Sequence, residues 1–143
     1  LILVPILSGS IIFLADLIRH MPIKMKLGMM TVSSYSGATT ESQGPKLEMD
    51  LEEDIHDQHV LVVDDILDTG KTLRFVRSNL SKRNPRSIRT AVLLRKPEKA
   101  PPDVTADFVG FEIADEFVVG YGLDYDDHYR NFPHIAVLKP DCY

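Results

Sequence analysis

The chain has 143 residues, about the length of one domain, and 44% of them are hydrophobic. It carries 16 Lys and Arg against 21 Asp and Glu, which gives a formal net charge of −5 with both signs mixed along the chain. This composition excludes a polyanionic tail, and without a basic excess we expect no electrostatic binding of nucleic acid.

The chain begins in a hydrophobic run, Leu1–Ile18, that Pro5, Ser8 and Asp16 interrupt. A membrane-spanning helix needs about 20 apolar residues, and a signal peptide begins with basic residues. We therefore expect neither, and no membrane partner. The single cysteine, Cys142, allows no internal disulfide and no cysteine-based zinc site, so we expect a reducing, cytoplasmic location. Because the run starts in mid-strand, we also expect a further segment before Leu1.

The first predicted elements are a strand, a turn and a helix. Leu1–Leu7 is a short apolar run typical of a buried strand, and Ser8–Ser10 is a turn. Helical spacing follows over Ile11–His20, and it predicts an inward face of Ile11, Leu14, Ala15 and Ile18.

The next segment alternates between strands and a long polar loop. Lys24–Ser33 and Lys46–Leu51 alternate in hydrophobicity, which predicts two strands. Between them, Ser34–Pro45 is small, polar and contains glycine. A loop of this length is usually a lid, a binding loop or disordered, although an ordinary surface loop is the simpler interpretation.

The second half of the chain predicts short strands around one helix. The helix is Lys71–Arg83, with Leu73, Val76 and Leu80 inward, and Asn84-Pro85 ends it. Loops are expected at Arg95–Val104, which holds three prolines, and at Leu123–Pro133. The predicted strands are Val60–Val63, Ser87–Leu94, Phe108–Ile113, Phe117–Val119 and Ile135–Leu138.

Buried strands that alternate with helices indicate an α/β fold with a mostly parallel sheet. No repeat or linker divides the chain, so we expect a single domain over residues 1–143. Ligands of such sheets bind beyond the carboxyl ends of the strands. The segments to inspect are therefore Ser8–Ser10, Asp64–Thr72, Lys96 and the residues after Val119.

The segment Val60–Thr72 carries the clearest chemical signal. An apolar strand ends in Asp64-Asp65, and Asp68-Thr69-Gly70-Lys71-Thr72 then opens a helix. Free N–H groups at a helix start bind anions, and Gly70 lets the backbone approach a phosphate closely. Three carboxylates nearby would repel a lone phosphate. The pattern therefore favours a sugar phosphate that binds together with a metal ion such as Mg²⁺.

Two other interpretations of this segment fail. Gly70-Lys71-Thr72 matches the end of a P-loop, but the first glycine of that motif would stand at position 65, which is Asp65. The acidic pair also resembles the pocket of a receiver domain, and Lys139-Pro140 resembles its Lys-Pro element. That domain needs a further Asp at the end of a later strand, whereas Asp103 and Asp107 precede one.

Val60–Leu73 resembles, without a gap, the phosphoribosyl pyrophosphate (PRPP) motif of the type I phosphoribosyltransferases. Phe108–Ile113 and Phe117–Tyr125 resemble the purine segment of the hypoxanthine-guanine branch, and Arg130 follows at the expected place. The resemblance extends from Leu1 to Leu138. It implies a mostly parallel twisted sheet flanked by helices, a small hood region from about residue 100 to 143, and a mobile lid loop that begins at Ser34-Tyr35.

The resemblance also assigns roles around the sugar phosphate. Asp64 and Asp65 would contact the ribose hydroxyls directly or through Mg²⁺, since carboxylates suit hydroxyl donors and hard cations. Asp124 would be a further metal or base contact. The 5′-phosphate would lie against Asp68, Thr69, Gly70, Lys71 and Thr72, although Lys71 could instead point to solvent.

Asp68 is the implied catalytic residue. A carboxylate near purine N7 can take or share the proton as N9 attacks C1′. The simpler interpretation is an N-cap of the helix that begins near Lys71, and the two roles are compatible because a cap would fix the side chain. Pyrophosphate would bind Ser8, Gly9, Ser10 and Arg130, with a cis peptide between Leu7 and Ser8. Position 8 departs from the family pattern, because most relatives have Lys there and Ser8 removes that charge.

The purine base would contact Lys96, Phe117, Val118 and Asp124. An ammonium donor at Lys96 would favour a 6-oxo purine over adenine, although the bland interpretation is a solvated basic loop. Phe117 would stack on the base. The five histidines show no metal-ligand spacing, and we assign none of them a catalytic role.

The resemblance therefore implies a Mg²⁺-dependent transfer of 5-phosphoribosyl from PRPP to N9 of hypoxanthine or guanine. Nucleoside monophosphate and pyrophosphate would be the products, and a homodimer or homotetramer the assembly. The alternatives are an enzyme that prefers xanthine, and a regulator of the same fold that binds nucleotide or RNA without purine salvage.

Overall fold

The computed structural model describes residues 1–33 and 44–139. The elements in these residues are β1 (Ile2–Leu7), α1 (Ile11–Arg19), β2 (Lys26–Leu27), β3 (Met30–Ser33), β4 (Lys46–Met49), β5 (His59–Leu67), α2 (Lys71–Ser81), β6 (Ser87–Arg95), β7 (Phe108–Glu112), β8 (Val118–Val119) and β9 (Ala136–Val137). The larger sheet has the strand order β4-β3-β1-β5-β6-β7, with β2 beside β1, and β8 and β9 form a separate small sheet.

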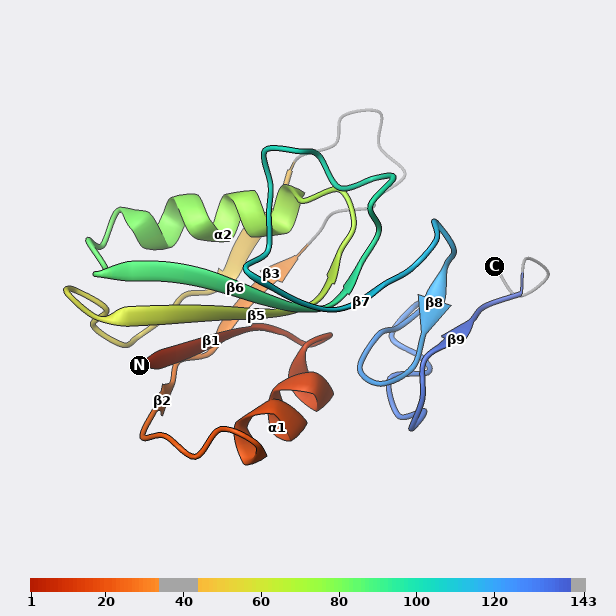
Figure 1. Ribbon diagram of the computed structural model, residues 1–143, viewed down its shortest axis with the longest axis horizontal. Helices are drawn as coiled ribbons and strands as arrows, with labels where there is room; N and C mark the ends of the chain where they lie inside the picture. Colours follow the sequence, from red (N-terminus) through yellow and green to blue (C-terminus); the bar gives the residue numbers. More distant parts are fainter. Residues whose placement is uncertain (34–43, 140–143) are drawn as a thin grey trace.

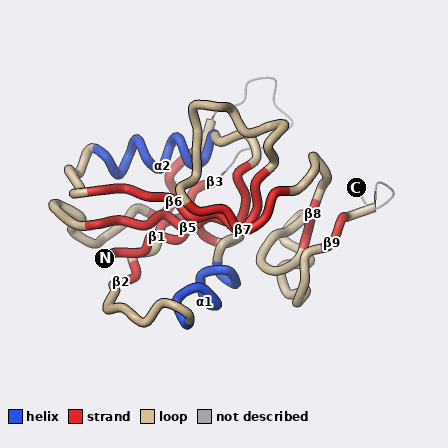
Figure 2. The backbone as a smooth tube through the Cα atoms, viewed as in Figure 1, coloured by secondary structure: helices blue, strands red, loops and turns tan. Residues whose placement is uncertain are grey.

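The larger sheet is parallel except where β4 returns antiparallel to β3. The helices α2 and α1 cover opposite faces of it (Figure 1). Figure 2 shows the same sandwich of one helix, the sheet and the other helix. The predicted α/β class and the mostly parallel, helix-flanked sheet are confirmed.

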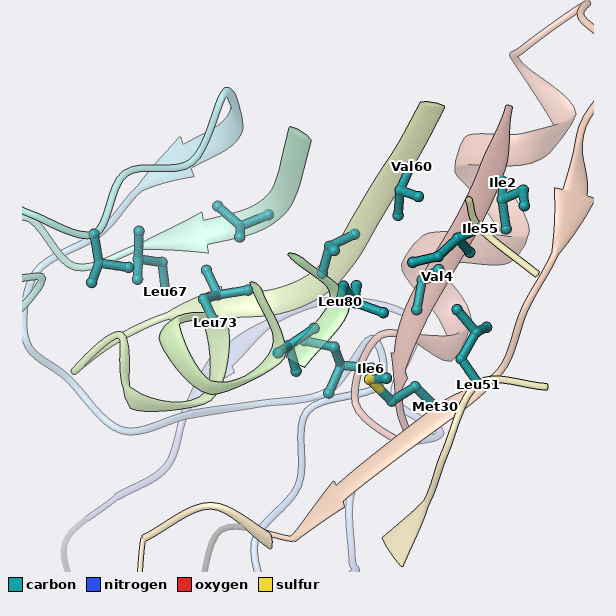
Figure 3. Packing of buried hydrophobic residues seen from close by; sticks show 14 residues of the cluster. Ile2, Val4, Ile6, Met30, Leu51, Ile55, Val60, Leu67, Leu73 and Leu80 are labelled. Carbon is teal, nitrogen blue, oxygen red and sulfur yellow. The ribbon is translucent and has the colours of Figure 1, made fainter. Parts of the chain in front are cut away.

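The central strands bury side chains on both faces, as parallel sheets do. On the α2 face, Val4, Val62 and Val92 belong to one buried cluster with Leu73, Val76 and Leu80 of the helix. Figure 3 shows Val4, Leu73 and Leu80 of this cluster. On the α1 face, Leu3 and Val63 pack with Leu14. The predicted inward face of α2 is thus confirmed, since all three of its side chains are at most 1% exposed.

The prediction of the inward face of α1 was wrong in part. Ile11 is 49% exposed, and Ala15 is exposed as well. Leu14 and Ile18 of the predicted face do pack in the core, and Phe13 and Leu17 join them there. The helix starts directly after the buried turn residue Ser10, so its first residue lies beyond the edge of the core.

The predicted strand Lys24–Ser33 is two strands, β2 and β3. Both pair with the same side of β1, β2 with Ile2 and Leu3 and β3 with Ile6 and Leu7. The chain bends between them at Gly28, where an added Cβ would lie 2.2 Å from Cδ1 of Leu51. Close packing of Leu51 against the backbone thus interrupts the strand.

The strand predicted over Val60–Val63 is longer than expected. Strand β5 continues to Leu67, and Asp64 and Ile66 pair with Val92 and Leu94 of β6. The acidic pair is therefore held inside the sheet and does not begin a loop, which fixes both carboxylates on rigid backbone.

The small sheet lies beyond the carboxyl ends of β1, β5 and β6 (Figure 1). Leu123 and partly buried Val118 pack against Leu93 and Leu94, which joins this unit to the larger sheet. A turn at Tyr125–His128 has positive φ at Asp126 and Asp127, the backbone of a tight type I′ hairpin. Of the described residues, none belongs to a helix long and apolar enough to cross a membrane.

Candidate active site

The acidic pair forms one wall of a cavity of about 380 Å³ at the carboxyl end of the sheet. Asp64 is 5% exposed, and one of its oxygens accepts the N–H of Asp65 at 3.0 Å. Asp65 in turn accepts the N–H of Ile66 at 2.7 Å. Each carboxylate is thus oriented by the next backbone amide.

Burial governs the protonation of this pair. It raises the pKa of Asp64 well above 3.8, and the adjacent charge of Asp65 raises it further. Burial likewise raises the pKa of Asp65, against hydrogen bonds from its neighbours and the charge of Arg130. The pair thus resists carrying two negative charges, and a cation or hydroxyl donors in the cavity would relieve this.

The turn before α2 forms the opposite wall, where residues 68–72 line the cavity. Gly70 has φ +71°, a left-handed conformation that L side chains rarely adopt. The first intrahelical bond runs from Arg74 N to the Gly70 carbonyl, so the N–H groups of the first turn have no helical partners. The predicted anion cradle at Thr69–Thr72 therefore faces the same space as the acidic pair.

The capping role considered for Asp68 was wrong. The N-cap of α2 is Gly70, with no side-chain cap. Asp68 instead points to Lys96, whose Nζ lies 3.3 Å from Asp68 Oδ2. Its other oxygen, Oδ1, is buried and accepts no hydrogen bond from the residues that the structure describes. Lys99 Nζ lies 3.7 Å from this oxygen, and Asp68 lines the cavity as a carboxylate paired with two lysines.

The turn after β1 supplies the third wall. The expected cis peptide between Leu7 and Ser8 is present. Ser8 and Gly9 line the cavity, and a Cβ added to Gly9 would lie 1.8 Å from Asp65 Oδ2. Ser10 lies differently from the other two, because it is fully buried and its Oγ donates to the Ile6 carbonyl at 2.7 Å.

Arg130 and Asp124 close the cavity from the side of the small sheet. Arg130 Nη1 lies 2.9 Å from Asp124 Oδ1 and donates to the Gly122 carbonyl at 2.8 Å. Both side chains also line a wider cavity of about 810 Å³ that extends past Ser8 toward β3. A guanidinium fixed in this way can hold a polyphosphate by two parallel hydrogen bonds.

A third cavity of about 170 Å³ contains the residues predicted for the purine. Its lining includes Lys96, Phe117, Val118 and Asp124, together with Asp65 and Asp68. Lys96 is 5% exposed, so the interpretation as a solvated basic loop was wrong. Phe117 packs edge-on against Tyr125, with ring centroids 5.7 Å apart.

Sequence reasoning missed several residues of this region. Asp115 lies 3.2 Å from Lys96 Nζ and 2.9 Å from Lys99 Nζ. A lysine expected to bind a base needs a carboxylate partner when buried; this requirement predicts that a partner exists but does not single out Asp115. Tyr121 donates from its hydroxyl to Asp16 of α1, which joins the small sheet to α1. The predicted lid residues Ser34 and Tyr35 lie outside the described residues.

The donor set suits Mg²⁺ when substrate supplies further ligands. Asp64, Asp65 and Asp124 offer hard carboxylate oxygens to one cavity. Within residues 1–33 and 44–139, no group of three or more His, Cys, Asp or Glu side chains is arranged to hold a metal ion alone. Mg²⁺ is typically bound through one or two carboxylates and substrate phosphates, so the residues present fit such a shared site.

Comparison with known proteins identifies the architecture. A family model described as the phosphoribosyl transferase domain matches residues 1–126. The chain is 44% identical over 143 residues to the hypoxanthine-guanine phosphoribosyltransferase of Mycobacterium tuberculosis, covering all of this chain and 71% of that protein. It is 46% identical over 142 residues to the enzyme of the same name from Streptococcus pneumoniae, covering 99% of this chain and 79% of that protein.

Solved structures agree with these relatives. A hypoxanthine phosphoribosyltransferase from Staphylococcus aureus superposes with a TM-score of 0.92 at 43% identity, covering 99% of this chain and 77% of that one. The Trypanosoma cruzi hypoxanthine phosphoribosyltransferase in complex with its product IMP gives a TM-score of 0.90 at 39% identity, covering 99% and 76% of the two chains.

Proposed function

This chain belongs to the phosphoribosyl transferase domain family, and we propose that it transfers the 5-phosphoribosyl group of PRPP to N9 of hypoxanthine or guanine. The products are IMP or GMP and pyrophosphate. This is a purine-salvage reaction in which the bond from C1′ to pyrophosphate breaks and the bond from C1′ to N9 forms.

The observation that carries this proposal is the wall common to two cavities. Asp65, Asp68 and Asp124 line both the cavity at the start of α2 and the smaller cavity at Lys96. A ribosyl transfer needs adjacent spaces for a sugar phosphate and a base, which meet where the new bond forms. The phosphate-binding features lie in the first cavity and the buried ammonium in the second, as this reaction requires.

The sugar phosphate is bound by backbone and carboxylates. The N–H groups of Thr69–Thr72 bind the 5′-phosphate at the helix start, where the helix dipole favours an anion. Asp64 and Asp65 accept hydrogen bonds from the ribose hydroxyls. These contacts hold C1′ at the common wall, and such positioning supplies a large part of the rate.

The leaving pyrophosphate is held on the side of Arg130, Ser8 and Gly9. Arg130 supplies positive charge where negative charge develops as the C1′–O bond breaks. Asp64, Asp65 and Asp124, together with PRPP, would hold Mg²⁺, which would supply further positive charge there. Because Ser8 is uncharged, Arg130 and backbone N–H groups carry more of this task than in relatives with Lys at that position.

Lys96 and Phe117 bind the base, and Asp68 accepts the proton that the base releases. Lys96 donates to the 6-oxo group, Phe117 stacks on the ring, and backbone groups of Val118 contact its edge. The Asp68 carboxylate, which lines both cavities, accepts the N7 proton as N9 attacks.

A PRPP-dependent assay with hypoxanthine, guanine, xanthine and adenine tests this proposal. We expect nucleotide from hypoxanthine or guanine and at least about 100-fold less from adenine, because its 6-amino group leaves the Lys96 ammonium unpaired. Dominant turnover of xanthine would move the substrate preference to that base. Absence of product with all four bases would leave a nucleotide-binding regulator as the function.

The same proposal includes a homodimer or homotetramer. Ile11 and Ile12 at the start of α1 are 49% and 38% exposed, which leaves apolar surface beside the turn at Ser8. Analytical ultracentrifugation of the wild-type protein and of Ile11→Glu measures the assembly. A monomeric wild-type protein at micromolar concentration would contradict this part.

A further inference from the structure

Two lysines and two carboxylates form a closed charge cluster behind the base cavity. Lys96 Nζ lies 3.3 Å from Asp68 Oδ2 and 3.2 Å from Asp115 Oδ1. Lys99 Nζ lies 2.9 Å from the same oxygen of Asp115 and 3.7 Å from Asp68 Oδ1. Lys96 and Asp68 line the base cavity, whereas Asp115 and Lys99 stand behind them and belong to none of the roles described above.

The geometry points to Asp115 as a positioning residue that sets the preference for 6-oxo over 6-amino purines through Lys96. This inference rests on the proposed function. An ammonium has three N–H donors and no acceptor. Asp68 and Asp115 each take one of them. The third N–H is then the only one left for a ligand, and its direction is fixed by the other two.

Removal of Asp115 would free the ammonium to turn. The Lys96 side chain is 6% exposed but that of Asp115 is 37% exposed, so water would take the place of the lost carboxylate without fixing the direction of the ammonium. The attraction of the Lys96 ammonium to Asp68 would become its only strong restraint. The N–H that points to the base would then lose its fixed direction. A 6-oxo group accepts from that donor and would lose affinity, whereas a 6-amino group presents its own donors and never gained from it.

Lys99 fixes the Asp115 carboxylate in the position from which it orients the Lys96 ammonium. The hydrogen bond from the Lys99 ammonium keeps the pKa of Asp115 below its ordinary value, which favours the ionised carboxylate that pairs with both lysines. Asp115 in turn raises the pKa of Lys99. The cluster is electrically balanced, with two positive and two negative groups, and Lys96 is therefore not drawn wholly onto either carboxylate.

The test is titration calorimetry with IMP and AMP, which differ in the group at C6 and in the proton that the 6-oxo form carries on N1. The proteins are wild type, Asp115→Ala, Asp115→Asn and Lys99→Met. Asp57→Asn is the matched control, because Asp57 is paired with Arg86 at 2.7 Å and precedes β5 at the amino end of the strand, away from the cavities. PRPP binding is measured for every variant to separate a local effect from general damage.

We expect Asp115→Ala to weaken IMP binding about 5- to 20-fold while AMP and PRPP binding change less than about twofold, as loss of one oriented charge-assisted hydrogen bond would produce. Asp115→Asn keeps an acceptor oxygen and should lose less, and Lys99→Met should lie between wild type and Asp115→Ala. If Asp115→Ala fails to fold, Asp115→Asn and Lys99→Met decide, with an expected loss of about 2- to 5-fold for IMP alone.

Equal losses for IMP, AMP and PRPP would overturn the inference, and so would an unchanged ratio of IMP to AMP affinity. A wild-type protein without preference for IMP over AMP would overturn it as well. If the wild-type protein binds IMP more tightly than AMP but forms no IMP from hypoxanthine and PRPP, the proposed function is wrong. The binding data on the variants then still decide whether Asp115 sets the preference for IMP.

Discussion

Gly9 and Asp65 pack so closely that a side chain at position 9 would displace the Asp65 carboxylate. A Cβ there would lie 1.8 Å from Oδ2 of Asp65, from a strand far along the chain. The turn after β1 and the acidic end of β5 are thereby held in contact. The two segments that we assign to pyrophosphate and to ribose thus meet where they line the cavity.

We predict that Gly9→Ala weakens PRPP binding at least about 10-fold and lowers the free energy of unfolding by about 1–3 kcal/mol, because the Asp65 side chain must move out of its place. Gly44→Ala is the matched control, since an added Cβ there meets nothing within 4 Å. Calorimetric titration of PRPP and thermal melts measure both effects. Wild-type PRPP affinity in Gly9→Ala would contradict the close packing.

We predict that Asp68→Asn lowers turnover at least about 10-fold while the protein stays folded, because a positioned proton acceptor is lost. Asn keeps the shape and one acceptor oxygen toward Lys96, so the base cavity should persist. Turnover is measured with saturating PRPP and base, and circular dichroism checks the fold. Full activity of the variant would remove Asp68 from proton transfer.

The buried acidic pair predicts a pH-dependent difference in stability. The folded pKa of Asp64 is raised above 3.8 by burial, so the folded state holds this proton at pH values where the unfolded chain has released it. The free energy of unfolding therefore falls as pH rises from about 3.8 through the raised folded pKa. In Asp64→Asn this contribution is absent.

Thermal melts of the wild-type protein and of Asp64→Asn at a series of pH values measure this difference. The Tm of the variant minus that of the wild type should grow as pH increases across this interval. Exposed carboxylates whose pKa is lowered, such as Asp57 beside Arg86, contribute equally to the stability of both proteins, so their contribution cancels in the difference. A constant or shrinking difference would show that Asp64 is not held in its protonated form by burial.

We predict that excess EDTA abolishes turnover and that added Mg²⁺ restores it. The described part of the chain offers carboxylates but no complete metal-binding group, so the metal ion must enter together with substrate phosphates. Initial rates with and without chelator measure this. Undiminished turnover in EDTA would reject the shared metal site.

Local sequence patterns predicted most of the sheet because β-branched runs such as Val60–Val63 are buried on both faces. They failed where a distant segment decides the local structure. Leu51 packs against Gly28 and divides one predicted strand into β2 and β3, and pairing with β6 extends β5 through the acidic pair.

In the site too, features formed by neighbouring residues were predictable and contacts between distant residues were not. The acidic pair and the start of α2 are contiguous in sequence, so their meeting in one cavity was predictable. The pairing of Lys96 with Asp115 was not, because it joins residues 19 positions apart through the end of β6 and the approach to β8. Gly70 replaced Asp68 as the N-cap because its left-handed backbone starts the helix, which left Asp68 free to face Lys96.

The central claim is that the two joined cavities transfer a ribosyl phosphate to a purine. Its most direct test is incubation of the purified protein with PRPP, hypoxanthine and Mg²⁺, with mass spectrometry for nucleotide and a separate assay for pyrophosphate. The account predicts IMP and pyrophosphate in equal amounts, with NMR placing the ribose on N9. Release of pyrophosphate without IMP, or no reaction with either 6-oxo base, would contradict it.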